Sequence, residues 1–186
     1  MSTTCTPALA ASLEWCQGTP EYPGIKRRVY YIPASDIVQW PTLPTNQAGQ
    51  FTSARYEGNF TLAQGKKWHY IDVLPDKCQL TSESQGEVPS VTQLNTLTLV
   101  HPAVGAEAAA AAFYFANTPC VFIVEDMKGN RRVVGNDRWN TVTTIAQDLG
   151  QGATGTTSTT ITAAVTDVAP APFYSGELET EDAAAE

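Results

Sequence analysis

The chain has 186 residues, of which 42% are hydrophobic, and a formal net charge of −8. This length fits one domain with a core of its own, and the composition is typical of a soluble globular protein. The acidic balance argues against a nucleic-acid-binding protein, which carries a basic stripe. The longest apolar run, residues 108–116, is too short to span a bilayer, so we expect no membrane partner.

Residues 1–23 mix Thr, Pro, Gly and scattered apolar residues without a period, which predicts an N-terminal arm. This stretch lacks the basic region and the apolar core of a secretory signal, so we expect the protein to fold in a cytoplasm. The four cysteines form no C-x-x-C pair, and reduced thiols are the expectation in that compartment. Their positions predict neither a metal site nor a disulfide framework: Cys5, Cys16, Cys78 and Cys120.

The first half of the body predicts a series of antiparallel strands, because runs rich in β-branched and aromatic residues are bounded by Pro and Gly. One run, residues 55–62, alternates cleanly between apolar and polar side chains, as a strand with one face in water does. Residues 42–53 are polar and aperiodic, which predicts a long functional or mobile loop. The expected strands are residues 26–32, 36–40, 55–62, 68–74, 80–87 and 91–100.

The second half predicts one helix among further strands. Pro102 occupies a favourable first helical position, and the alanines of residues 103–116 allow the helix backbone to lie close to a sheet. We expect an aromatic cluster to fill space at one end of that helix: Phe113, Tyr114 and Phe115. Residues 120–124 have no polar face, which predicts a central strand. A tight turn at Lys128-Gly129-Asn130 leads into the remaining strands, at residues 131–134, 140–147 and 157–168.

These eight to ten strands and one helix predict a mainly β fold, an antiparallel β-sandwich or barrel with one flanking α-helix. We expect an arm at residues 1–23, a β-sandwich domain at residues 24–176, and an acidic disordered tail at residues 177–186. Five acids in that tail support the last interpretation: Glu177, Glu179, Glu181, Asp182 and Glu186.

Candidate reaction chemistry is sparse. Gly150, Gly152 and Gly155 have the spacing G-x-G-x-x-G, but no helix sequence follows to face a pyrophosphate, so we expect a flexible hairpin loop and no nucleotide cofactor. His69 and His101 lack any accompanying nucleophile signature. Their expected places are a half-exposed strand and a turn or helix cap. The sequence therefore predicts a protein that is not an enzyme, with no catalytic, cofactor-binding or metal residues.

An acidic pair and three short basic clusters each have a structural explanation besides a functional one. The pair Glu125-Asp126 precedes a hairpin, where a solvated turn is more common than a cation site. Short basic clusters could contact a phosphate backbone, or they could block unwanted pairing at strand edges: Lys26-Arg27-Arg28, Lys66-Lys67 and Arg131-Arg132.

Three segments resemble the tail tube protein family of tailed bacteriophages and prophages. Residues 24–37 (GIKRRVYYIPASDI) resemble the opening of these subunits, and the strand, helix, strand and hairpin of residues 94–134 resemble their middle. Residues 161–176 (ITAAVTDVAPAPFYSG) resemble the last strand and its exit toward a C-terminal arm.

The resemblance implies a structural virion protein that forms homo-hexameric rings with an inner β-barrel, stacked into a tube through which DNA passes. Its implied partners are other copies of itself, other phage tail proteins and DNA in non-specific passage. The implied location is the phage tail in the virion, assembled in the host bacterial cytoplasm. The stacking loop of that family maps by position to residues 42–53, and the arms map to residues 1–23 and 177–186.

Three other classes stay open from the sequence. Another virion component, such as a tail-completion or head-decoration protein, shares the β-rich acidic profile. A carbohydrate-binding module would use exposed aromatic side chains: Trp15, Trp40, Trp68 and Trp139. An enzyme would need a deep pocket around His69 or His101 with a carboxylate within hydrogen-bonding distance.

Overall fold

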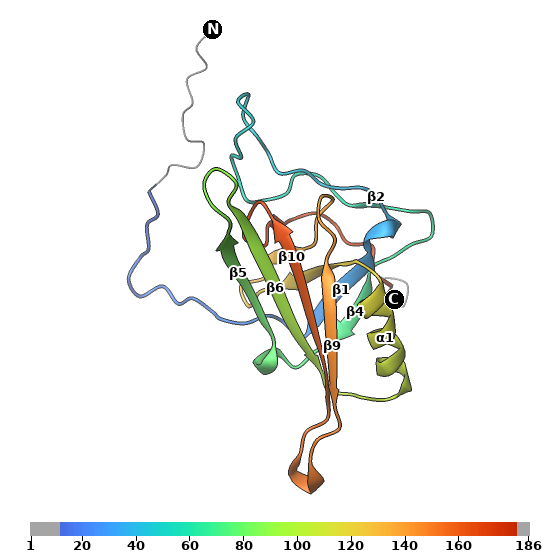
Figure 1. The fold of residues 1–186 in the computed structure, drawn as a ribbon. Coiled ribbons are helices and arrows are strands. Elements are labelled where there is room, and N and C mark those ends of the chain that lie inside the picture. Colours follow the sequence, from blue (N-terminus) through green and yellow to red (C-terminus); the bar gives the residue numbers. More distant parts are fainter. Residues whose placement is uncertain (1–11, 182–186) are drawn as a thin grey trace.

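The structure is a computed structural model that describes residues 12–181. Two antiparallel sheets face each other, and one helix lies beside them (Figure 1). The five-stranded sheet has the order β11-β8-β7-β1-β4, the four-stranded sheet has the order β5-β6-β10-β9, and β2 pairs with β3. The predicted mainly β sandwich with one flanking helix is therefore confirmed.

The elements follow one another along the chain with three short 3-10 turns between them. Their bounds are β1 (Arg28–Pro33), η1 (Ala34–Asp36), β2 (Ile37–Gln39), β3 (Thr61–Leu62), β4 (His69–Asp72), η2 (Pro75–Lys77), β5 (Gln79–Gln85), β6 (Thr92–His101), α1 (Ala106–Asn117), β7 (Cys120–Glu125), β8 (Arg131–Val134), β9 (Val142–Asp148), η3 (Gly152–Thr154), β10 (Ser158–Asp167) and β11 (Phe173–Tyr174).

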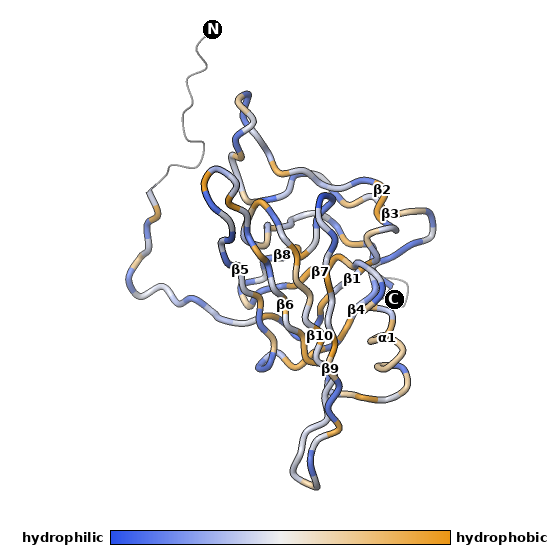
Figure 2. The backbone as a smooth tube through the Cα atoms, in the orientation of Figure 1, coloured by the Kyte–Doolittle hydropathy of each residue, from blue (hydrophilic) through white to orange (hydrophobic). Residues whose placement is uncertain are grey.

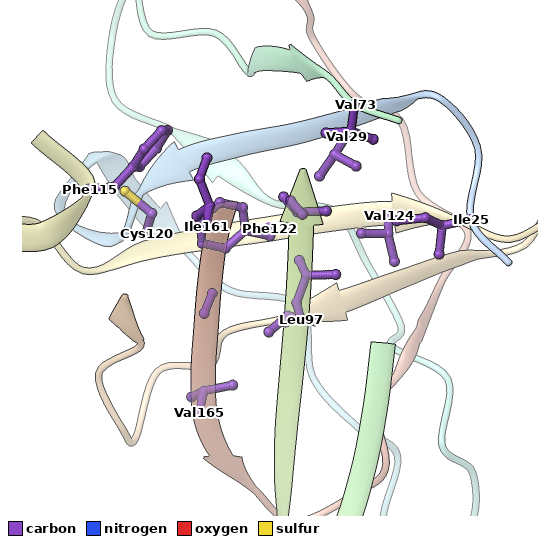
Figure 3. Close-up of a cluster of buried hydrophobic side chains, with 13 residues drawn as sticks. Ile25, Val29, Val73, Leu97, Phe115, Cys120, Phe122, Val124, Ile161 and Val165 are labelled. Atoms are coloured by element: carbon purple, nitrogen blue, oxygen red, sulfur yellow. The ribbon is translucent and has the colours of Figure 1, made fainter. Parts of the chain in front are cut away.

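Strand β7 explains how the body is held together. It lies in the middle of the five-stranded sheet, as the apolar run of residues 120–124 predicts. Because successive side chains of a strand point to opposite faces, its residues feed two separate cores. Phe122 packs between the two sheets in a cluster that Figure 3 shows together with Leu97 and Ile161. Ile123 packs on the other face, against Trp68 and neighbouring side chains.

The second cluster is covered by the segment that contains β2 and β3. Phe60 stands at its centre, with ring centroids 5.6 Å from Trp40, 5.3 Å from Trp68 and 5.1 Å from Tyr174. Figure 2 shows hydrophobic colour along the strands of the body, while the tip of the β9–β10 hairpin is mostly hydrophilic or neutral. The five-stranded sheet is thus buried on both faces, whereas the four-stranded sheet has one face in solvent.

Three expectations need correction. Residues 55–62 do not form one regular strand, because only Thr61–Leu62 pairs in a sheet, although Tyr56 and Phe60 are buried as the alternation predicts. In α1 only Phe115 is buried, at 2% exposed, whereas Phe113 is 76% exposed. Phe115 reaches the core through an edge contact with Tyr31, their ring centroids 4.7 Å apart, and the helix packs mainly on β9.

The third correction concerns the acidic tail. Over its described part, residues 177–181, the chain is not a solvated end but is fixed to β4. Leu178 packs against the second cluster, and Glu177 O accepts a hydrogen bond of 3.0 Å from the Tyr174 hydroxyl. The remaining residues of the expected tail, 182–186, lie outside the described residues, as do residues 1–11 of the expected arm.

Candidate assembly surface

The chain itself pairs with part of each edge of the five-stranded sheet. At the β4 edge the Trp68 N–H donates to Glu179 O over 2.8 Å, and the Glu181 N–H donates back to Trp68 O over 3.2 Å. At the β11 edge the Tyr56 N–H donates to Phe173 O over 2.9 Å, and the Phe173 N–H donates to Ala54 O over 2.9 Å. These bonds occupy backbone groups that a further strand would otherwise use.

The four-stranded sheet is different. Within residues 12–181, β5 pairs in a sheet with β6 alone and β9 pairs with β10 alone. No isolated bridge or other backbone hydrogen bond of that part of the chain reaches the outer side of either strand. The backbone groups on the outer sides of β5 and β9 therefore have no backbone partner among these residues, and another strand can add to them, although α1 packs on β9.

The outer face of this sheet is rich in threonine and carries no positive charge. The inward positions hold core residues such as Leu97 and Ile161, so the alternate positions face solvent. None of the 11 Lys and Arg residues of the chain falls in β5, β6, β9 or β10. On the outward positions the charged residues are Glu83 and Asp148. The threonines there are Thr81, Thr92, Thr96, Thr98, Thr144, Thr160, Thr162 and Thr166.

The two ends of the molecule carry projecting segments. Residues 42–53 form a finger held by its own hydrogen bonds, including 2.9 Å from the Asn46 N–H to Gln50 O and 2.9 Å from the Thr52 N–H to Pro44 O. The β9–β10 hairpin projects at the opposite end of the molecule (Figure 1). Exposed apolar side chains stand at both ends, with Val88 89% exposed in the β5–β6 turn and Leu149 77% exposed in the hairpin.

The predicted glycine loop is the tip of that hairpin. Gly150 and Gly152 have positive φ angles of 76° and 65°, and the short 3-10 turn Gly152–Thr154 is followed by β10 rather than by an α-helix. A Cβ on Gly155 would lie 2.3 Å from the Gln151 nitrogen, so the loop closes too tightly on itself for a larger residue. The glycines serve a turn, and the expected hairpin is confirmed.

The two histidines, His69 and His101, have different contacts. His69 Nδ1 lies 2.9 Å from Glu181 Oε1 on the exposed edge of β4, where this pair helps to fix the C-terminal segment. His101 lines a cavity of about 280 Å³ between α1 and the sheets, with Asp72 and Glu107. Its Nδ1 lies 2.7 Å from the backbone oxygen of Asp72, and within residues 12–181 no hydrogen bond joins its ring to a carboxylate.

The remaining charged candidates have partners within the fold. Asp126 stabilises the predicted hairpin turn, because its carboxylate accepts hydrogen bonds from the Lys128 and Asn130 N–H groups over 2.9 and 2.8 Å. Partial burial would raise the pKa of Asp126, but these hydrogen bonds help to lower it below its ordinary value. The basic clusters lie mostly on the five-stranded sheet, as in the 2.5 Å pair of Lys26 with Glu125 and the cation–π contact of Arg132 with Phe173, 3.8 Å from the ring centroid.

Two of the four tryptophans considered for carbohydrate binding are not exposed. Trp68 is buried and Trp40 packs on its cluster, so these two do not offer an exposed sugar platform.

Three cysteines are free, Cys16 exposed, Cys78 half-buried and Cys120 buried, while Cys5 lies outside the described residues. Residues 12–181 hold no group of three or more His, Cys, Asp or Glu side chains suited to a metal ion. None of the helices in that part of the chain is long and apolar enough to span a membrane.

Comparisons of the chain with protein-family models, with curated proteins and with solved structures found no match.

Proposed function

We propose that this chain is a structural subunit that assembles through its four-stranded sheet into stacked hexameric rings, the tail tube of a tailed bacteriophage. The observation that carries the proposal is the combination of two open edges and a face without Lys or Arg on one and the same sheet. The resemblance of residues 24–37, 94–134 and 161–176 to tail tube subunits supports it independently.

The edges supply the lateral contact. An antiparallel sheet that ends in free strands on both sides can continue into an identical neighbour on each side, β5 of one copy beside β9 of the next. Such a head-to-tail contact makes a ring when its rotation closes, and a closed ring leaves no strand edge free. The other sheet takes no part in this joining, because residues 54–56 and 179–181 pair with part of each of its edges.

The outer face supplies the lining. A ring closed through the four-stranded sheets turns one face of each sheet toward the axis. Threonine hydroxyls keep that face hydrated without adding charge, and Glu83 and Asp148 add repulsion toward phosphates. A wall with Lys and Arg would bind the DNA backbone in a salt-dependent way, whereas this composition lets DNA pass.

The test is negative-stain electron microscopy of the purified chain over a concentration series, in which we expect rings or tubes at high concentration. Val142→Lys places a charge on the edge strand β9, where Val142 is 64% exposed, and should abolish the rings while changing stability by less than about 0.5 kcal/mol. Val38→Lys is the matched control, since Val38 is 69% exposed on β2, away from both edges.

Two outcomes decide against the proposal. If the concentrated protein forms neither rings, tubes nor stacks, and other tail proteins do not recruit it, a virion protein that does not polymerise becomes the better interpretation. If Val142→Lys forms the same rings as the unaltered chain, the rings close through another surface, and the role proposed for the four-stranded sheet is wrong.

A further inference from the structure

The core between the two sheets is covered differently at its two sides. At the β9 side it is covered by α1, because Ala111 and Phe115 pack in the cluster between the sheets and the helix packs mainly on β9. At the β5 side the molecule has a cavity of about 500 Å³. β5 and α1 lie at opposite sides of the four-stranded sheet (Figure 1). The sandwich thus has one side covered by a helix and one side that is hollowed.

The cavity, here named the β5 groove, lies between the two sheets and has an apolar floor. Leu80 and Ser82 line it from the inward positions of β5, and Val124 lines it from β7. Ile25 and Ala171 complete this part of the wall, and Figure 3 shows Ile25 next to Val124. A cavity on the order of 150 Å³ already holds a benzene ring. The β5 groove therefore has room for an aromatic side chain.

The charged residues at the rim of the β5 groove have partners within the fold. Lys128 forms an ion pair with Glu21, and Asp126 accepts hydrogen bonds within its own turn. Arg132 donates to Ala171 O over 3.3 Å. The rim thus holds two acids and two bases, and its net charge is zero. An uncharged occupant suits such a groove, because a further charge would lose water without gaining a new partner.

Phe113 is the most exposed aromatic side chain of residues 12–181, at 76%. It projects from α1, in which Glu107 is the one charged residue. The residues three and four positions before it, Ala109 and Ala110, are exposed as well and lie on the same face of the helix. A phenyl ring therefore stands above small side chains at the side of the molecule opposite the β5 groove. Removing this ring from water would release free energy.

A head-to-tail contact between two copies brings this ring and the groove together. The pairings within the four-stranded sheet are all antiparallel, so β5 and β9 run in opposite directions and β5 of a second copy can pair with β9 in the same sense. Successive pairings across the sheet place Leu80 of the groove on the same row as Thr143 of β9. The helix and the groove also lie on the same face of this sheet, the face that forms the core.

We propose that Phe113 of one copy inserts into the β5 groove of the next copy, so that α1 covers the hollowed side of its neighbour's sandwich. This contact rests on the proposed function, because it accompanies the pairing of β9 with β5 of the neighbouring copy. Backbone hydrogen bonds between edge strands give affinity but little choice of register, whereas an aromatic side chain in a groove supplies both specificity and binding energy.

Phe113→Ser in the full chain is the first test. Because this side chain is exposed in the single chain, we expect the melting temperature to change by less than about 2 °C. Rings should appear by electron microscopy only at a protein concentration at least tenfold higher than for the unaltered chain. Val38→Ser is the matched control, since Val38 is 69% exposed on β2, and it should leave the ring-forming concentration unchanged.

Cys78 lines the β5 groove and permits a second test by cross-linking. Phe113→Cys is combined with Cys5→Ser and Cys16→Ser, and rings of this variant are treated with a short bis-maleimide. We expect a ladder of covalent oligomers up to the hexamer on a denaturing gel, and we expect Cys78→Ser to abolish it. Val38→Cys in place of Phe113→Cys should give no ladder.

The outcomes separate this contact from the proposed function. Absence of rings from the unaltered chain overturns the proposed function and this contact with it. Rings that form at the same concentration with Phe113→Ser, or that give no ladder through Cys78, overturn the contact alone. Covalent dimers without larger species would show a two-fold pair in place of a head-to-tail contact, and they also overturn it.

Discussion

The two sheets of the sandwich share a core but differ in the backbone pairing of their edge strands. The five-stranded sheet has β4 and β11 as its edges, and the chain returns to both of them, with residues 179–181 at one and residues 54–56 at the other. Among residues 12–181, no segment pairs by backbone hydrogen bonds with the outer side of β5 or β9, and the helix α1 packs on β9. The difference shows that, among the described residues, backbone pairing at the outer side of an edge strand is confined to the five-stranded sheet.

The largest expected effect comes from removing the C-terminal segment that pairs beside β4. Removing residues 177–186 takes away Leu178 and both backbone hydrogen bonds at Trp68. We expect a loss of about 3 kcal/mol in the free energy of unfolding, or roughly 6–12 °C in melting temperature, measured by calorimetry. The truncated chain should also aggregate through its exposed β4 edge.

The control for this truncation is removal of residues 182–186 alone, which leaves every described contact of the C-terminal segment in place. We expect its melting temperature to match that of the full chain within about 1 °C. If both truncations melt at the same temperature as the full chain, the C-terminal segment does not close the β4 edge in solution, and the contrast between the sheets disappears.

A smaller effect should follow from altering the hairpin that extends the open sheet. In Gly155→Ala the new Cβ would meet the Gln151 nitrogen at 2.3 Å, so the loop must rearrange. We expect a loss of about 1–2 kcal/mol, measured by denaturant unfolding. Thr156→Ala in the same exposed loop serves as the control and should change stability by less than about 0.5 kcal/mol. Equal stability of the two variants would mean that the hairpin tip is not fixed as described.

The smallest expected effect is a difference in the rates at which the cysteine thiols react with a labelling reagent. This measurement compares cysteines of the two sheets in the unaltered chain. Cys16 is exposed, Cys78 precedes the open strand β5, and Cys120 is buried in β7. Burial raises the pKa of Cys78 and raises that of Cys120 to about 12, which suppresses the reactive thiolate of both. We expect Cys16 to react first, Cys78 more slowly, and Cys120 only on global unfolding.

The same labelling in denaturant without reductant should return four thiols, since the sequence contains four cysteines. A lower count would show a disulfide and contradict the expectation of reduced cysteines. Labelling of Cys120 as fast as Cys78 would show that the two sheets separate readily, contrary to the shared core.

Much of the fold follows from local patterns in the sequence. The apolar run of β7 predicts a strand buried on both faces, and the alanines of residues 103–116 predict the helix, because these signals are local. The expected helix start at Pro102 was wrong, since α1 begins at Ala106. The failures are of another kind. Phe113 has the same local signal as Phe115, yet only Phe115 faces the core, since the contact depends on where Tyr31 lies in a distant strand. Residues 55–62 alternate correctly, but apart from Thr61–Leu62 they pair only through single bridges, at Arg55 and Glu57.

The candidate assembly surface is harder to predict from the sequence than the fold. The absence of Lys and Arg from four strands can be read directly from the sequence, once those strands are known. Open edges cannot, because they depend on which segment pairs with which over long separations. Residues 177–181 have the composition of a solvated tail, and the one apolar residue among them, Leu178, is the only local sign of their attachment.

The attachment of residues 179–181 beside Trp68 also sets an order of events during synthesis. Trp68 and Glu179 are 111 residues apart in the sequence. The β4 edge therefore stays unpaired on the ribosome until residues 179–181 have been made. The β9–β10 hairpin, by contrast, joins neighbours in sequence and forms as soon as it is made. Nascent chains that lie close together on one messenger RNA therefore meet while the β4 edge is still able to pair, and slow translation of this stretch should increase aggregation.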